Sequence, residues 1–226
     1  MQRFKKIKWG IAVSLTYCAT APIIGSADTE VIKDLEPSMP LGVIDSKLVQ
    51  YGYSGTEKLR FDVSWSGGIK IGELQLEINR IEDVADDFEI RAAITTKGGA
   101  VHLFYPINDL HVTKVRGKEK LPYHYEVWQK EGYSYKAHRV VEYDQEKRHI
   151  RYTKNDKIEN EYQLDGIVNN EFSSFFNSRL MDFSSNKPFL VPTFADKKRV
   201  EVAVHPRGSN IVKGTILGDV KATEIM

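Results

Sequence analysis

The feature that most constrains the fold of this chain is an alternation of apolar and polar side chains with a period of two residues. It begins near Leu59. This period is typical of strands that have one face in a core and the other in water. The apolar positions of the first three stretches are Phe61, Val63 and Trp65, then Leu74, Leu76 and Ile78, then Phe88, Ile90, Ala92 and Ile94. The sequence therefore predicts a mainly β protein.

Short turns join the later strands. Tyr123–Trp128 and Tyr133–Tyr143 flank a turn at Gly132, and strands over Arg148–Thr153 and Ile158–Leu164 follow. Such short connections join antiparallel neighbours, because a parallel crossover needs about a dozen residues or more. We predict a meander that forms a strongly curved antiparallel sheet or an open barrel. The last strands are expected over Val200–Val204, Ile211–Leu217 and Val220–Ile225.

One segment, from Asn170 to Phe183, departs from the alternation. Asn169 or Asn170 is a suitable helix N-cap, and the apolar side chains that follow recur at helical spacing. These side chains are Phe172, Phe175, Phe176, Leu180 and Phe183. A stripe this aromatic requires burial, so we expect one apolar helix against the concave face of the sheet.

The N-terminus, residues 1–27, has the features of a secretory signal peptide. A basic start precedes the short apolar stretch Ile11–Ala21, and the small residues of Gly25–Ala27 provide a cleavage site. The apolar stretch is shorter than the roughly 20 residues that a membrane-spanning helix needs. We predict cleavage after Ala27, export to the periplasm and no stable membrane insertion afterwards. Residues 28–58 are expected to be a lead-in segment, and residues 59–226 a single β-rich domain.

Composition excludes several classes of protein. The chain has 226 residues, of which 41% are hydrophobic and 28% charged, as in ordinary globular domains. Its single cysteine, Cys18, rules out an intrachain disulfide framework. The formal net charge of +1 lacks the basic excess that nucleic-acid binding usually requires, so no nucleic-acid partner is expected.

No catalytic motif stands out. The chain has no glycine-rich phosphate loop, nucleophile elbow or zinc-binding His-Glu-x-x-His helix. His124 and His138 flank one hairpin, where we expect two polar residues on its solvent side, without the third ligand that a metal would need. No metal or cofactor is predicted. The catalytic residues are unknown, and the sequence favours a non-enzymatic function while leaving catalysis open.

Aromatic residues supply the candidate binding site. The tyrosines around one hairpin either form a ladder packed under the helix or line a pocket for lipid tails or sugar rings. Arg179, beside the aromatic stripe of the helix, either reaches water or meets an anionic group. The candidate ligand-binding residues are Trp65, Phe104, Tyr105, Tyr123, Tyr125, Phe176 and Arg179.

Four short pieces of the chain resemble a bacterial exported family that is known only as a domain of unknown function. They are Phe61–Glu73, Thr96–Gly99 ahead of a Phe104–Pro106 strand, Leu121–Pro122, and Glu171–Arg179. The resemblance implies a periplasmic, β-rich protein of Gram-negative type and carries no activity. In the helix, Asn170–Phe172 replaces the family's aspartate-proline-leucine. The resemblance also implies further C-terminal strands, so we expect a shortened C-terminus with an unpaired edge.

These observations favour an exported binding or envelope-assembly factor that holds an apolar or amphipathic ligand, such as a lipid or glycan, in its curved sheet. One alternative is a cell-envelope enzyme acting on polysaccharide. Another is a structural module that binds a partner protein, whose identity is unknown, through its sheet edge. A cavity lined by Trp65, Phe104, Tyr125 and Phe176 would favour the first hypothesis.

Overall fold

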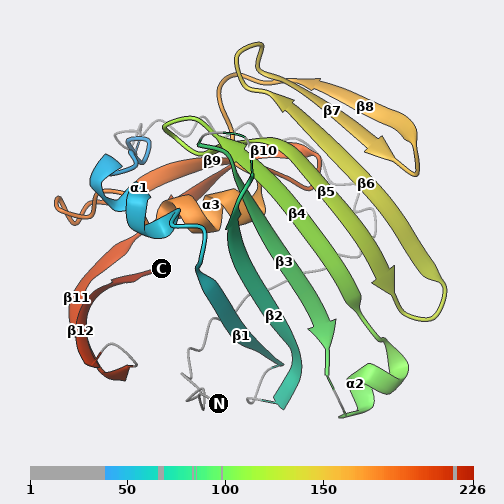
Figure 1. Ribbon diagram of the computed structural model, residues 1–226, viewed down its shortest axis with the longest axis horizontal. Coiled ribbons are helices and arrows are strands. Elements are labelled where there is room, and N and C mark those ends of the chain that lie inside the picture. The colour runs from blue at the N-terminus through green and yellow to red at the C-terminus, as the bar shows by residue number, and fades with distance from the viewer. Residues whose placement is uncertain (1–38, 66–68, 83, 85, 98, 216–217) are drawn as a thin grey trace, which may run out of the picture.

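The computed structural model describes residues 39–65, 69–82, 84, 86–97, 99–215 and 218–226. The predicted signal peptide lies outside the described residues. Eight strands form one antiparallel sheet in chain order (Figure 1). They are β1 (Lys58–Trp65), β2 (Ile69–Arg80), β3 (Phe88–Thr96), β4 (Asn108–Arg116), β5 (Leu121–Glu131), β6 (Tyr135–Asp144), β7 (His149–Lys154) and β8 (Lys157–Gln163). Within the described residues β1 and β8 do not pair, so the sheet is not closed.

The alternation of apolar side chains sets which face of each strand is buried. Leu76 and Ile78 of β2 lie opposite Ala92 and Ile90 of β3, and all four are buried. We call this the inner face of the sheet and the opposite one the outer face. The predictions of a mainly β fold and of an antiparallel meander are confirmed.

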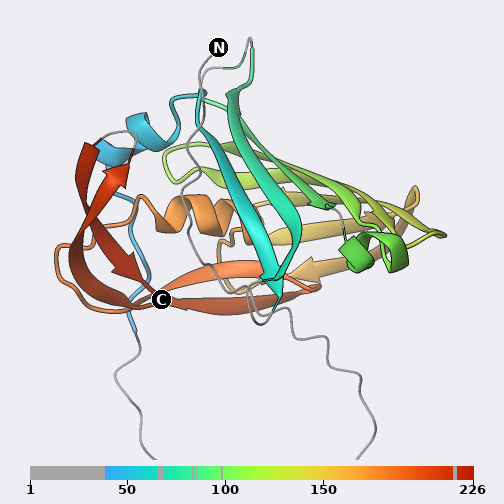
Figure 2. The ribbon, with the colours of Figure 1, turned by 90° about the horizontal axis from the view of Figure 1, so that it is seen from below.

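The predicted helix exists but is shorter than expected. α3 spans Glu171–Ser178, and its N-cap is Asn170, whose side chain accepts a hydrogen bond from the Ser173 amide. Arg179 is the C-cap, so Phe183 lies beyond the helix. Figure 2 shows α3 between the sheet and a hairpin of β9 (Phe189–Ala195) and β10 (Lys198–Val204).

Four elements do not follow from the alternation: β4, β9, α1 (Ser46–Gly52) and α2 (Gly99–Phe104). The expected strand over Phe104–Pro106 is wrong, because Phe104 ends α2. β4 lacks the alternation of apolar and polar residues because buried residues occupy both of its faces. Val112 and Thr113, for example, are adjacent and both buried.

Three groups of buried side chains hold the layers together. Phe176 and Leu180 pack against β2 and β3, whereas Phe194 of β9 packs against Tyr143 of β6 and Tyr162 of β8. A third group joins Met181 to the β9–β10 hairpin. Phe172 contacts the first two groups. Its position at the start of α3 therefore links the two halves of the inner face.

Hydrogen bonds fix the position of α3 as well. The Asn177 side chain donates to the carbonyl oxygens of Glu119 and Lys120 and to Asn169 Oδ1, and Tyr53 donates to Asn177 Oδ1. Except for the contact with Glu119, which is partly buried, these hydrogen bonds are buried, and a buried polar atom without a partner costs about 1–3 kcal/mol. The network therefore favours a single position of α3 on the sheet.

The C-terminal strands β11 (Pro206–Thr215) and β12 (Gly218–Ile225) form a separate two-stranded ribbon. Most of its side chains are exposed. In the part of the chain that the structure describes, no helix combines the length and the apolar content needed to cross a bilayer.

Candidate functional site

The predicted ligand-binding residues do not lie in one place. Phe104 is 78% exposed at the end of α2, and Tyr105 follows it with its hydroxyl donating to Glu131. α2 lies at the lower end of the sheet in Figure 1, away from α3, which contains Phe176 and has Arg179 as its C-cap. The side chain of Trp65 lies outside the described residues.

The other predicted residues have well-defined neighbours. Phe176 is buried in the core, and Arg179 forms two hydrogen bonds with the carboxylate of Glu57. Tyr123 lies under the guanidinium of Arg116, which is 3.4 Å from the ring centre. Tyr125 lies on the inner face, where its hydroxyl is within hydrogen-bonding distance of His111.

A row of inner-face residues crosses the middle of the sheet. His111 of β4 is opposite Val127 of β5, Val127 is opposite Arg139 of β6, and Arg139 is opposite Lys154 of β7. Adjacent strands lie roughly 5 Å apart. The row thus places an imidazole and a guanidinium two strands apart, on the same face as α3. In Figure 1 the lower halves of β4 and β5 extend beyond that helix.

His111 is the most perturbed group in this row. Its Nδ1 shares a 2.7 Å hydrogen bond with the Tyr125 hydroxyl, and its ring packs 4.9 Å from the ring of Phe172. Burial, aided by the positive charge of Arg139, lowers the pKa of His111 to about 4. The imidazole is therefore neutral at physiological pH. Its Nε2 is buried and has no hydrogen-bond partner.

Arg139 supplies the positive charge. Burial by itself would lower the pKa of its guanidinium, but a hydrogen bond with Tyr152 and the nearby tyrosines outweigh burial and raise it. Its Nε is also buried without a partner. Two side chains of the row thus carry unpaired nitrogen atoms, although buried polar groups in folded proteins are nearly always paired.

Polar side chains continue the inner face below this row. Asp109 of β4 is buried and accepts a hydrogen bond of 2.8 Å from the Lys130 amide. Burial raises the pKa of its carboxyl, and the charge of Glu131 acts in the same direction. Burial also raises the pKa of Tyr125, which keeps its hydroxyl protonated. Perturbed titratable groups that cluster in this way are a common mark of functional sites.

The sequence contained one usable signal for this cluster. Arg139 lies in phase with Ala137, Val141 and Tyr143, so the alternation places a charge on a buried face. His111 gave no such signal because β4 lacks a clear alternation. The meeting of the two residues depends on strand register, which no local pattern specifies.

The outer face carries two other polar clusters. His124 and His138 both approach Glu126, with nitrogen–oxygen distances of 3.5 and 2.7 Å. Their predicted position on the outer side of one hairpin is confirmed, with partly exposed side chains. Within the described residues no group of three or more His, Cys, Asp or Glu residues is arranged to hold a metal ion.

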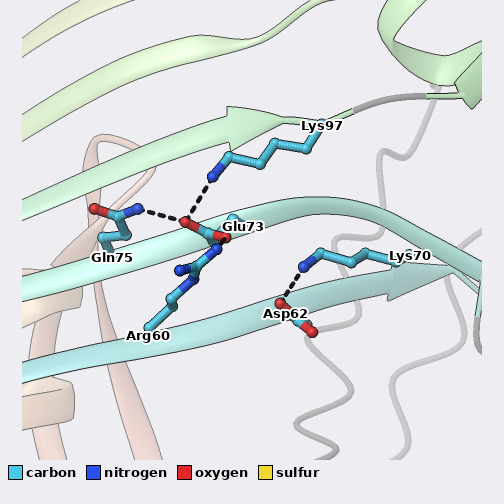
Figure 3. A network of polar contacts seen from close by, with 6 residues as sticks. All are labelled: Arg60, Asp62, Lys70, Glu73, Gln75 and Lys97. Carbon is cyan, nitrogen blue, oxygen red and sulfur yellow. Dashed lines mark hydrogen bonds and ion pairs between the residues drawn. The ribbon is translucent and has the colours of Figure 1, made fainter. Parts of the chain in front are cut away.

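The second outer cluster centres on Glu73 of β2 (Figure 3). Arg60, Gln75 and Lys97 donate to its carboxylate, and neighbouring Lys70 pairs with Asp62. Solvent does not reach the Glu73 carboxylate, although its cover is one layer of long side chains and not the core. These contacts come from β1, from β2 itself and from the residue that follows β3. We therefore interpret the cluster as a set of ion pairs that holds these three strands together at the edge of the sheet.

Comparison with known proteins gives one match. The model of a family described as "Protein of unknown function (DUF3108)" matches residues 60–224. No curated protein and no solved structure matches the chain. The matched range includes the whole inner-face row and α3.

Proposed function

Because this chain belongs to the DUF3108 family, whose function is unknown, we propose a function from its own geometry: it is an exported protein that binds an amphipathic ligand with an acidic head group on the inner face. The observation that carries the proposal is the pair of unpartnered buried nitrogens, His111 Nε2 and Arg139 Nε. A ligand oxygen between the two side chains would provide the missing partner.

The charges favour an anionic head group. Arg139 keeps its positive charge, and a guanidinium binds carboxylates and phosphates with a fixed planar geometry. The neutral imidazole of His111 donates from Nε2 when Tyr125 donates to Nδ1. Tyr125 retains its proton because burial raises its pKa. In that arrangement, both unpaired nitrogens are donors.

The surroundings favour an apolar part of the same ligand. Phe172 and Val127 border His111, and Ala137 lies beside Arg139 on the inner face of β6. Aromatic and aliphatic side chains next to a few polar groups are the usual composition of small-molecule sites. Export to the periplasm, proposed on residues 1–27, would place such a site where envelope lipids and glycans occur.

Mass spectrometry of the protein produced with its own leader tests export and binding together. A denatured mass that corresponds to cleavage after Ala27 would support export. In native spectra, we expect an adduct that is lost on denaturation. Arg139→Gln should remove the adduct, whereas Arg151→Gln, a control in β7 on the outer face, should retain it. An adduct that persists in Arg139→Gln would contradict the proposed site.

A binding titration distinguishes the contribution of the ligand's head group from that of its apolar tail. We expect octanoate to bind the wild-type protein and octanol, which lacks the charge, to bind at least about tenfold more weakly. Arg139→Gln should remove this difference, and Arg151→Gln should preserve it. If both compounds bind the wild-type protein equally, the result would support an apolar binding site but contradict a site for an acidic head group.

One observation favours a second candidate, an enzyme that acts on polysaccharide. Asp109 is a buried carboxyl with a raised pKa, which is the property required of a general acid in glycoside hydrolysis. Hydrolysis of cell-wall glycans by the purified protein, abolished in Asp109→Asn, would support this candidate. Absence of hydrolysis together with octanoate binding would favour the binding protein.

A further inference from the structure

The lower end of the sheet carries a cluster of exposed apolar side chains. Leu103 and Phe104 of α2 are 68% and 78% exposed, and Tyr133 in the β5–β6 turn is 79% exposed. We call these three residues the apolar tip. Exposed aromatic and aliphatic residues that gather at one place often mark an interaction site.

The apolar tip is held by specific contacts. The Tyr133 hydroxyl donates to the Leu103 carbonyl, and the Tyr105 hydroxyl donates to Glu131 at 3.0 Å. The Gly132 amide donates to the Pro106 carbonyl at 2.8 Å. Gly132 has a φ of +60°, and a Cβ there would lie 3.3 Å from the Tyr105 ring. The segment after α2 is therefore fastened to the β5–β6 hairpin, and its apolar side chains remain on the outside.

Two lysines flank the apolar tip. Lys130 of β5 and Lys136 of β6 lie directly opposite each other in the hairpin, and both are exposed. Among the described contacts neither lysine forms an ion pair. Like charges directly opposite each other on paired strands are destabilising, and an anionic group bound at the two lysines would relieve this repulsion. The acidic residue between them, Glu131, is already bonded to Tyr105 and Gln129.

We propose that the apolar tip and the Lys130–Lys136 pair dock on the surface of an anionic phospholipid bilayer. Phe104 and Leu103 would enter the head-group region, Tyr133 would lie at its polar boundary, and the lysines would face lipid phosphates. Aromatic side chains next to basic residues are the usual composition of such interfacial sites. This proposal does not rest on the inner-face ligand site, since none of its residues belongs to that site.

Flotation with vesicles of phosphatidylcholine, with and without phosphatidylglycerol, tests the proposal. We expect the protein to bind the vesicles that contain phosphatidylglycerol and to dissociate as salt is added. Lys130→Gln combined with Lys136→Gln should weaken this binding about tenfold or more. Lys213→Gln combined with Lys221→Gln, which removes two exposed charges from β11 and β12, should leave binding unchanged.

The apolar contribution has its own matched variants. Leu103→Ser combined with Phe104→Ser should also weaken vesicle binding about tenfold or more, because both side chains leave water on docking. Ile211→Ser combined with Tyr51→Ser removes apolar side chains of similar exposure, 65% and 71%, from β11 and α1 and serves as the control. All four side chains are exposed, so folding should be preserved, and circular dichroism checks this.

Three results would overturn the proposal. One is the absence of binding to phosphatidylglycerol vesicles, and another is an equal loss of binding in the control variants. The third is a dimer in sedimentation velocity that Leu103→Ser with Phe104→Ser dissociates, which would make the apolar tip an interface between copies. Arg139→Gln should bind vesicles like the wild-type protein, so a failure of the ligand site and a failure of the apolar tip are distinguishable.

Discussion

Glu57 and Arg179 face each other through two hydrogen bonds of 3.1 and 2.6 Å, although they lie 122 positions apart in the chain. Glu57 immediately precedes β1, and Arg179 caps the end of α3. The Arg179 guanidinium also lies 5.3 Å from the centre of the Phe176 ring. The pair therefore connects the edge of the sheet to the end of the helix that covers it.

We expect Glu57→Gln to lower the free energy of unfolding by about 1–2 kcal/mol, because it breaks a bidentate, partly buried pair. Glu77→Gln is the matched control, since it breaks the more exposed pair with Lys58. That change should cost less than about 0.5 kcal/mol. Urea denaturation measures both values. Equal losses would show that the Glu57–Arg179 geometry adds no stability beyond that of a surface pair.

Asn177→Ala is expected to destabilise the protein by about 2–4 kcal/mol. The substitution removes the hydrogen-bond partner of the Tyr53 hydroxyl and a donor to the Lys120 carbonyl, both in the core. Asn169 Oδ1 also loses a donor, although Ser173 still donates to it. Asn210→Ala, which removes an exposed hydrogen bond to Glu224, should change stability by less than about 0.5 kcal/mol. A similar urea midpoint for the two variants would mean that water replaces the lost hydrogen bonds.

The pH dependence of stability should report on Glu73. Burial alone would raise the pKa of its carboxyl, but hydrogen bonds from Gln75, Lys97 and Arg60 lower it to about 2. A lowered pKa stabilises the fold above the unfolded value of 4.5, and this stabilisation is lost as pH falls from 4.5 towards 2.

Glu73→Gln should therefore be less stable than the wild type at neutral pH, by on the order of 1–2 kcal/mol. This is less than the full pKa difference implies, because Arg60 and Lys97 are largely exposed and water screens them. The deficit should shrink as the pH approaches 2 and also in high salt. Thermal unfolding of both proteins at several pH values tests this. A deficit independent of pH would indicate a loss of packing, and not of charge.

His111 should affect stability in a different pH range. Burial lowers its pKa from 6.5 to about 4, so between these values the unfolded chain binds a proton that the folded chain does not. Stability from this residue is therefore full above pH 6.5 and falls as the pH decreases towards 4.

His111→Gln retains a hydrogen-bonding group near the Tyr125 hydroxyl but does not titrate. Between pH 6.5 and 4 the free energy of unfolding of this variant should therefore fall by less than that of the wild type. The difference between the two losses should be on the order of 2 kcal/mol. Urea midpoints of both proteins across this range provide the measurement. Parallel pH profiles would show that His111 is solvated and that the inner-face site is open to water.

Local patterns predicted part of this structure. The alternation correctly placed Tyr125 and Val141 on the buried face, and the asparagine ahead of an aromatic stripe marked the start of α3. α2 did not follow from sequence because its six residues are too few to establish a helical period. Phe104, which the sequence placed in a strand, is therefore found at the exposed end of a helix.

The candidate site was less accessible to sequence reasoning. His111 and Arg139 are 28 positions apart, and the registers of both the β4–β5 and β5–β6 pairs must be known before the two residues come together. Arg179 illustrates the same limit, because its partner Glu57 lies before the first strand of the sheet. Side chains whose roles depend on distant partners are specified by the fold as a whole.

The strand order has a consequence for how the chain folds. Each strand from β1 to β8 pairs with the next in sequence, so every pairing in the sheet is local in the chain, whereas α3 begins only at Glu171. A chain synthesised from its N-terminus therefore completes the strands before it contains the helix that covers Leu76 and Ile90. During that interval, a chaperone that shields apolar surfaces would protect the nascent sheet from aggregation.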